Sequence, residues 1–192
     1  MGGSKKGVRH EAPPCAAALH CRAAGRYRWI MPRKALPATT DGRDARFMGV
    51  ALETARDAGA RGETPIGAVV IDPETGGVVA AAGNAPIAQH DPTAHAEIRV
   101  LRAAGLARAN YRLTGLHLYV TIEPCAMCAG AISHARIARL VYGADDPKGG
   151  GVAHGAKVFD HPTCHWRPEL ASGVRADEAA ELLRAFFKER RA

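Results

Sequence analysis

The sequence predicts an α/β fold in which helices cover both faces of one mixed sheet of five strands, a three-layer α/β/α sandwich. Two observations carry this prediction. Along residues 46–191, segments with the apolar spacing of helices are interspersed with short β-rich segments. In addition, one strand, helix, strand succession predicts a parallel crossover, because parallel neighbours need a connection of helical length. At 192 residues the chain suits one domain of ordinary size rather than two.

The first half of the periodic region predicts a helix, a hairpin and a second helix. From Arg46 to Ala58 the apolar residues recur at three- and four-residue steps, and two glycines then end this amphipathic helix. Residues 67–71 and 78–82 are β-rich and flank a turn-like segment that contains Pro and Gly, so they predict a hairpin. Residues 96–107 carry an apolar stripe at helical spacing.

The second half predicts the crossover, an edge strand and a terminal helix. Residues 116–122 alternate like a strand, 125–136 form a helix of small residues, and 138–143 form the next strand. Residues 168–174 begin with a proline, which keeps this strand at the edge of the sheet. Residues 177–191 predict an amphipathic helix. Its predicted inward residues are Ala180, Leu183 and one of the adjacent Phe186 and Phe187.

The net charge of +7 is concentrated at the N-terminus. Residues 1–44 hold nine Lys and Arg against three acids, whereas residues 45–192 hold seventeen against sixteen. The sequence therefore predicts a basic, disordered extension over 1–44 and a near-neutral domain over 45–192. An organellar transit peptide and a later start at Met31 or Met48 are the alternatives for the extension. The charge is thus poor evidence for nucleic-acid binding by the domain.

Cysteine usage and hydropathy predict a cytoplasmic protein. An odd number of cysteines at low density does not fit a small secreted disulfide scaffold, so a reducing compartment is expected. No segment approaches the roughly 18 to 20 apolar residues of a membrane helix, which predicts no membrane partner. The five cysteines are Cys15, Cys21, Cys125, Cys128 and Cys164.

Two short segments carry the most specific chemical signal in the chain. The first is His95-x-Glu97, and the second is Pro124-Cys125-x-x-Cys128. Two cysteines three residues apart at a helix start place both sulfurs on one side, and helix N-termini favour the thiolate that binds zinc. His95, also at a predicted helix start, adds an imidazole nitrogen. Together they predict three protein ligands for Zn²⁺.

Three ligands and one open position are typical of catalytic zinc, whereas structural sites usually have four protein ligands. Zinc lowers the pKa of water in the open position to about 7. Glu97, two residues from His95, is then placed beside that water as a proton shuttle. The alternatives are a redox pair or half of a structural zinc knuckle. The pairing of both motifs at predicted helix starts favours the catalytic interpretation.

These motifs resemble the signature of the zinc-dependent cytidine and nucleotide deaminase superfamily. Longer strings at 84–98, 118–131 and 143–149 resemble the tRNA-specific adenosine deaminase family in particular. The resemblance covers about residues 46–191. It implies a cytidine deaminase-like fold and a homodimer with one zinc per subunit.

The resemblance also implies a reaction and its residues. The expected activity is hydrolytic deamination of adenosine to inosine at the wobble position, 34, of a tRNA anticodon, with the anticodon stem-loop as partner. His95, Cys125 and Cys128 would hold zinc, and Glu97 would protonate the ring nitrogen and then the departing ammonia. Asn84 matches the pocket asparagine that hydrogen-bonds the target nucleoside.

One stretch departs from the family pattern. Where the family often shows His-Pro-x-x-Asn-His-Arg, residues 161–167 place His165 and Trp166 at the Asn-His positions. Trp166 could stack on a base or cover a sheet edge. Arg190 or Arg191 could contact phosphate, although cations at a helix C-terminus are favourable without RNA. His154, His161, Cys164 and His165 lie near one another in the sequence, but their spacing fits no standard metal-binding motif and the region is loop-like, so a second metal site is not expected.

Two other functions remain open from sequence. A deaminase of free guanine, cytosine or a nucleoside would share the zinc chemistry and differ in the pocket. A non-catalytic zinc or RNA-binding module would have no use for Glu97 beside an open metal position. The Asp145-Asp146-Pro147-Lys148 string and the terminal helix favour the tRNA substrate.

Overall fold

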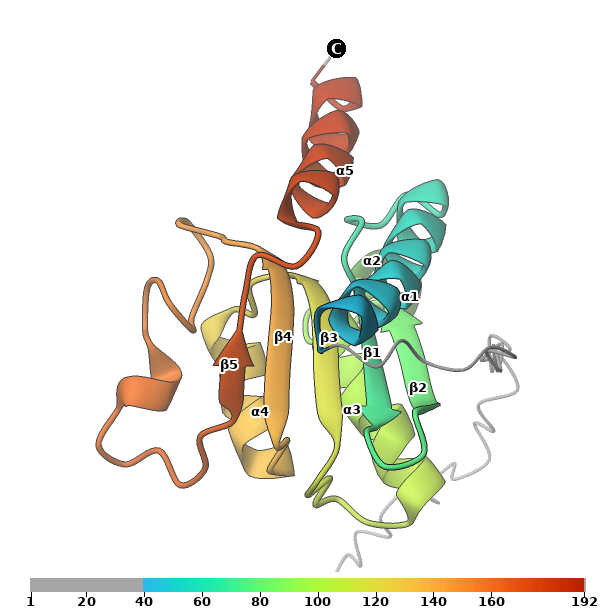
Figure 1. Cartoon of the computed structure of the whole chain (residues 1–192). Helices are drawn as coiled ribbons and strands as arrows, with labels where there is room; N and C mark the ends of the chain where they lie inside the picture. Colours follow the sequence, from blue (N-terminus) through green and yellow to red (C-terminus); the bar gives the residue numbers. More distant parts are fainter. Residues whose placement is uncertain (1–39, 192) are drawn as a thin grey trace, which may run out of the picture.

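The computed structural model describes residues 40–191, and it confirms the predicted three-layer α/β/α fold (Figure 1). One five-stranded sheet has the order β2-β1-β3-β4-β5. The strands are β1 (Gly67–Asp72), β2 (Gly77–Gly83), β3 (His117–Ile122), β4 (Arg139–Ala144) and β5 (Glu169–Ala171). The helices are α1 (Thr40–Ala60), α2 (Pro86–Gln89), α3 (Ala96–Arg108), α4 (Ala126–Ala135) and α5 (Ala176–Glu189), with a 3-10 turn η1 (Val158–Asp160).

The sheet is mixed, as predicted. β1 pairs antiparallel with both β2 and β3, whereas β3, β4 and β5 are parallel. The β3-α4-β4 unit is the expected crossover. This unit positions the start of α4. The carboxyl ends of β3 and β4 lie at the same end of the sheet, and α4 begins directly after β3 at that end.

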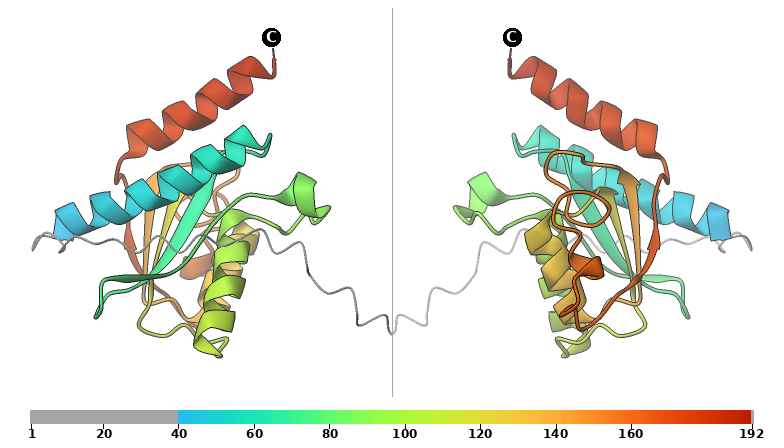
Figure 2. Two further views of the ribbon diagram at one scale, coloured as in Figure 1. Left: turned by 90° about the vertical axis from the view of Figure 1, so that its right-hand side faces the viewer. Right: turned by 90° about the vertical axis from the view of Figure 1, so that its left-hand side faces the viewer.

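Helices cover both faces of the sheet. α1 and α5 lie on one face and α3 and α4 on the other (Figure 2). Successive strand residues point to opposite faces, so Val69 and Tyr119 pack with α1 while Val70 and Leu118 pack with α3 and α4. Full burial of one such aliphatic side chain contributes about 1.5–3 kcal/mol. No helix between residues 40 and 191 is long and apolar enough to cross a bilayer.

The first helix begins earlier than its apolar pattern predicts. α1 starts at Thr40 rather than Arg46, and its first turns place Asp44 beside β3 and β4, where it is 5% exposed. Arg139 donates to both Asp44 oxygens at 2.8 and 2.9 Å, and the Tyr119 hydroxyl donates at 2.8 Å. Burial raises the pKa of Asp44, but these hydrogen bonds outweigh burial and hold that pKa below 3.8.

The predicted basic extension, residues 1–44, lies outside the described residues as far as residue 39. Residues 40–44, which were assigned to this extension, instead form the first turn of α1. The disorder predicted for residues 1–39 stays a prediction.

The terminal helix packs less deeply than predicted. Ala179 is the buried residue of α5, while Phe187 is 44% exposed and Phe186 is half-buried, so neither phenylalanine joins the core. The guanidinium of Arg190 lies 4.0 Å from the Phe186 ring centroid and donates to the carbonyl of Gly62. The end of α5 is thus held to the loop that follows α1.

Candidate metal centre and active site

The two predicted ligand motifs start two neighbouring helices. His95 is the N-cap of α3, Cys125 is the N-cap of α4, and Cys128 lies in the first turn of α4. The side chain of His95 does not hydrogen-bond to the amides of α3, whereas the sulfur of Cys125 accepts from amides in the first turn of α4. Both side chains lie close to one point between the two helix N-termini.

The three donor atoms have the spacing of a tetrahedral zinc site. The Nδ1 atom of His95 lies 3.8 Å from the sulfur of Cys125 and 3.6 Å from the sulfur of Cys128. All three ligand atoms lie within 4.8 Å of one another. Zinc bonds of about 2.0 Å to nitrogen and 2.3 Å to sulfur at tetrahedral angles would separate nitrogen from sulfur by about 3.5 Å. The two nitrogen–sulfur distances therefore fit Zn²⁺.

The electrostatics of the cysteine pair favour a thiolate. The hydrogen bond from Cys128, together with backbone amides of the first turn of α4, lowers the pKa of Cys125 to about 5. The same hydrogen bond and burial raise the pKa of Cys128. The N-terminal end of α4 adds its positive dipole. One sulfur is thus ionised at neutral pH, and a bound cation would favour ionisation of the second.

Glu97 lies in the first turn of α3 beside this group and is 4% exposed. Burial raises the pKa of Glu97 to about 7. A carboxyl group with a pKa near 7 can both take and give a proton at neutral pH. The structure therefore brings together the predicted proton shuttle and the predicted ligands.

Asn84 lies directly after β2 and is 5% exposed. Its side-chain oxygen accepts the amide of Ala96 at 2.8 Å, which supplies the cap that His95 does not give to α3. Its own backbone amide donates to Ile66 at 2.9 Å. No described residue accepts from the side-chain nitrogen of Asn84, which leaves a donor for a ligand.

Glu123 is an acid at the site that sequence reasoning did not single out. Its side chain is fully buried and accepts backbone amides of the following loop, with the ring of His154 at 2.7 Å. Burial raises the pKa of Glu123, but these bonds outweigh it and lower the pKa to about 2. The four amides belong to Asp146, Val152, Ala153 and His154.

The loop that Glu123 binds lies against Cys125, one of the three candidate zinc ligands. Gly150 forms a bridge with Cys125, and the amide of Gly151 donates to Pro124 at 2.8 Å. A Cβ atom on Gly151 would lie 2.5 Å from the amide nitrogen of Ala126, so only glycine fits there. The sequence offers one indication that Glu123 is important: it is an acid at the end of an apolar strand, immediately before Pro124 and Cys125.

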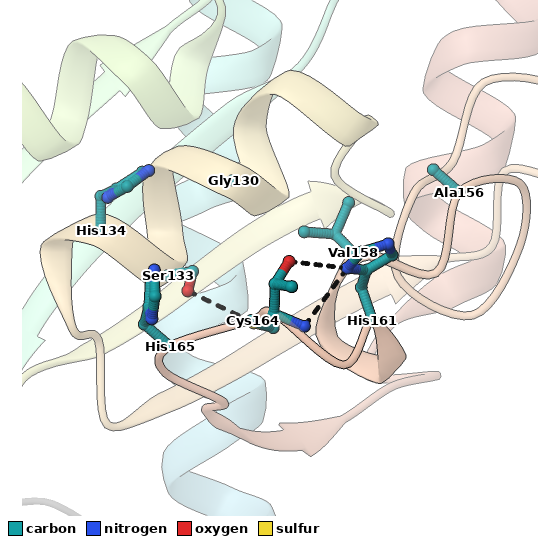
Figure 3. A pocket seen from close by; sticks show the side chains of 9 residues that line it. Gly130, Ser133, His134, Ala156, Val158, His161, Cys164 and His165 are labelled. Atoms are coloured by element: carbon teal, nitrogen blue, oxygen red, sulfur yellow. Dashed lines mark hydrogen bonds between the residues drawn. The ribbon is translucent and has the colours of Figure 1, made fainter.

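The structure does not bring His154, His161, Cys164 and His165 together as a second metal site within the described residues. His154 bonds to Glu123, and His161, Cys164 and His165 form no group close enough to share an ion within the described part of the chain. His161, Cys164 and His165 instead line an open pocket of about 300 Å³ beside α4, together with His134 of that helix (Figure 3).

Trp166 has contacts that favour its structural interpretation. Its ring nitrogen donates to the carbonyl of Ile137 at 2.7 Å, next to the start of β4. The guanidinium of Arg136 lies 5.9 Å from the ring centroid. The hydroxyl of Ser133 donates to the Trp166 carbonyl at 2.8 Å. These contacts hold the side chain at the sheet edge, where it covers the end of α4.

Comparison with known proteins agrees with this geometry. Residues 41–144 match the model of the cytidine and deoxycytidylate deaminase zinc-binding region. The chain is 54% identical over 145 residues to a tRNA-specific adenosine deaminase of Agrobacterium fabrum, which covers 76% of this chain and 94% of the relative. A protein of the same name from Haemophilus influenzae is 47% identical over 148 residues, 77% of this chain and 85% of the relative.

Solved structures give the same result. A tRNA:A34 deaminase structure, described as editing A to I at the wobble position, is 54% identical with a TM-score of 0.70 and covers 72% of this chain and 99% of that one. A guanine deaminase from Nitrosomonas europaea is 24% identical with a TM-score of 0.66, over 79% of this chain and 86% of that one, and it shows the fold alone. The chain therefore belongs to the zinc-binding cytidine and deoxycytidylate deaminase family and, within it, to the tRNA-specific adenosine deaminases.

Proposed function

We propose that this protein deaminates adenosine to inosine at position 34, the wobble position, of a tRNA anticodon. The observation that carries the proposal is 54% identity to a tRNA-specific adenosine deaminase along 94% of that relative's length. The site supports it independently, since the ligand group and Glu97 lie together at the N-terminal ends of α3 and α4.

We propose that His95, Cys125 and Cys128 hold one Zn²⁺ per subunit. Their fit to a tetrahedral site with one open position supports this assignment. When bound, zinc would act as a Lewis acid that makes water a competent nucleophile at neutral pH.

Glu97 would move the protons of the reaction. Water adds to C6 of adenine, the bond between C6 and the amino nitrogen breaks, and ammonia leaves. Glu97 would accept a proton from the attacking water, deliver one to the ring nitrogen, and later assist the departure of the amino group.

Asn84 would orient the nucleoside through its free side-chain nitrogen, while its oxygen stays bound to Ala96. The target base must leave its stack to enter the site, and this costs little in an anticodon loop that is already single-stranded. The anticodon stem-loop is therefore the smallest expected substrate.

The decisive experiment offers purified, zinc-loaded protein an anticodon stem-loop with adenosine at position 34. A stem-loop with adenosine in the stem serves as the control, and free adenosine, guanine and cytosine are tested in parallel. We expect inosine in the first RNA alone. Turnover of a free base or nucleoside without turnover of the stem-loop would replace this proposal with a free-nucleobase deaminase.

We also propose that the enzyme is a homodimer located in the cytoplasm, where its tRNA substrate is found. An open groove of about 1210 Å³ runs between α3 and α4, and apolar residues including Ile98, Leu101 and Ala131 line it. At its rim, Leu106 is 84% exposed and Tyr111 is 70% exposed. A second copy that covers this face would remove these side chains from water.

A further inference from the structure

Glu63 is a buried acid that the proposed chemistry does not use. It lies in the loop between α1 and β1 and is 2% exposed. One carboxylate oxygen accepts the amide of Ala88 at 2.8 Å, and the other accepts that of Ile87 at 3.3 Å. Amides in the first turn of a helix have no partner within the helix, and the N-cap residue Ala85 offers no side-chain bond. Glu63 therefore caps α2 from a distant point in the sequence.

α2 has little else to hold it in place. It comprises four residues, none of them buried, and Ile87 is 63% exposed. A helix of this length does not form by itself in water, because nucleation is unfavourable. The amide of Ala85 donates to the carbonyl of Ala94 at 3.0 Å, which joins the two ends of the segment that contains α2. The buried carboxylate of Glu63 then fixes the position of α2 within this segment.

α2 stands between two residues of the candidate site. Asn84 precedes it and His95 follows it. The loop that carries Glu63 also holds Asn84, because the carbonyl of Ile66 accepts the Asn84 amide at 2.9 Å. On its other side this loop is bound by α5 through Arg190 and the Gly62 carbonyl. One loop therefore fixes both Asn84 and the segment that leads from it to His95.

We propose that Glu63 is a positioning residue for substrate binding, which holds α2 as a fixed rim of the nucleoside pocket beside Asn84. The inference rests on the proposed deaminase function. The carboxylate of Glu63 bonds to α2, whereas His95 and Glu97 are positioned by the start of α3. Loss of Glu63 therefore weakens binding of the nucleoside and leaves metal binding and the chemical step in place.

The test is Glu63→Gln, which keeps the size of the side chain but turns one acceptor oxygen into a donor that faces a backbone amide. The matched control is Glu53→Gln, an exposed glutamate on α1. We expect KM for the stem-loop to rise on the order of tenfold, as for the loss of one hydrogen bond to a charged acceptor. We expect kcat to stay within about twofold and zinc to remain at one per subunit.

Hydrogen exchange gives a readout that does not depend on activity. The amides of Ile87 and Ala88 should exchange faster in Glu63→Gln than in the wild type, while those of α3 stay protected. Glu63→Asp keeps the charge but is too short to reach both amides, so it should change exchange and KM in the same direction. It also serves where Glu63→Gln does not fold.

Three results would overturn the inference. They are faster exchange with an unchanged KM, a fall in kcat without a rise in KM, and unchanged exchange in both variants. A wild-type protein that does not deaminate the stem-loop would contradict the proposed function instead. The exchange rates would then still decide whether Glu63 holds α2.

Discussion

The buried carboxylate of Asp44 should be one of the largest single contributions to the stability of this fold. It joins α1 to the start of β4 and to β3 through two bonds from Arg139 and one from Tyr119. Asp44→Ala leaves the guanidinium of Arg139, 12% exposed, without its buried partner. The remaining partner, Glu169, is 71% exposed and compensates little.

The magnitude follows from the cost of an unpaired buried charge. Removing one partner of a buried ion pair typically costs about 3–5 kcal/mol. Since Arg139 is the first residue of β4 and its side chain is 12% exposed, water can reach it, and we expect about 3 kcal/mol for Asp44→Ala. With a urea m-value of about 2 kcal/mol/M, the midpoint of unfolding should fall by about 1.5 M. The double variant Asp44→Ala, Arg139→Met should recover much of that loss, because no charge then stays buried alone.

Urea unfolding at saturating zinc measures these changes, and the pH dependence gives a second check. Because the folded pKa of Asp44 is lower than its ordinary 3.8, its contribution is present above pH 3.8 and is lost as pH falls through the folded pKa. The stability difference between wild type and Asp44→Asn should therefore shrink below that pH. A loss under about 1 kcal/mol for Asp44→Ala, or full additivity with Arg139→Met, would refute the reasoning.

Four further outcomes test the site and the assembly. Glu97→Gln should retain zinc by metal analysis while kcat for the stem-loop falls by at least about a hundredfold, and near-normal turnover would contradict its role as proton shuttle. Cys125→Ser should lose both zinc and activity, so a variant that keeps stoichiometric zinc would mean that the ligands are misassigned. Leu106→Asp should give a monomer in analytical ultracentrifugation, and an unchanged dimer would place the interface elsewhere. A chain that begins at Met31 should deaminate the stem-loop as the full chain does; a large loss of affinity with a flatter salt dependence would assign RNA binding to the extension.

The elements that the sequence predicts well have a long apolar pattern and depend on neighbouring residues rather than on distant polar partners. The α3 and α4 helices and the β3-α4-β4 crossover belong to this class. The sequence also indicates that His95, Glu97, Cys125 and Cys128 lie at helix starts, and the structure places them there. Their proximity depends on spacing that is visible in the chain itself, while their roles stay predictions. The nucleoside contact of Asn84 comes from resemblance alone and stays a prediction, whereas its bond to the distant amide of Ala96 becomes visible only in the fold.

The features that sequence missed are buried acids with distant partners. Asp44, Glu63 and Glu123 interrupt apolar patterns or lie in loops, and each is satisfied by groups far along the chain. Hydropathy treats such residues as solvated. That is why α1 was predicted to begin too late and why α2, which has no buried side chain of its own, was not predicted at all.

The placement of the ligands on two separate helices has a consequence for the metal-free chain. His95 and Cys125 are 30 residues apart, and a bound ion would join them as a cross-link closes a loop. Metal affinity then becomes folding free energy, worth about 2.7 kcal/mol at a hundredfold excess of zinc over its Kd. Zinc binding would thus stabilise the fold as well as complete the proposed active site.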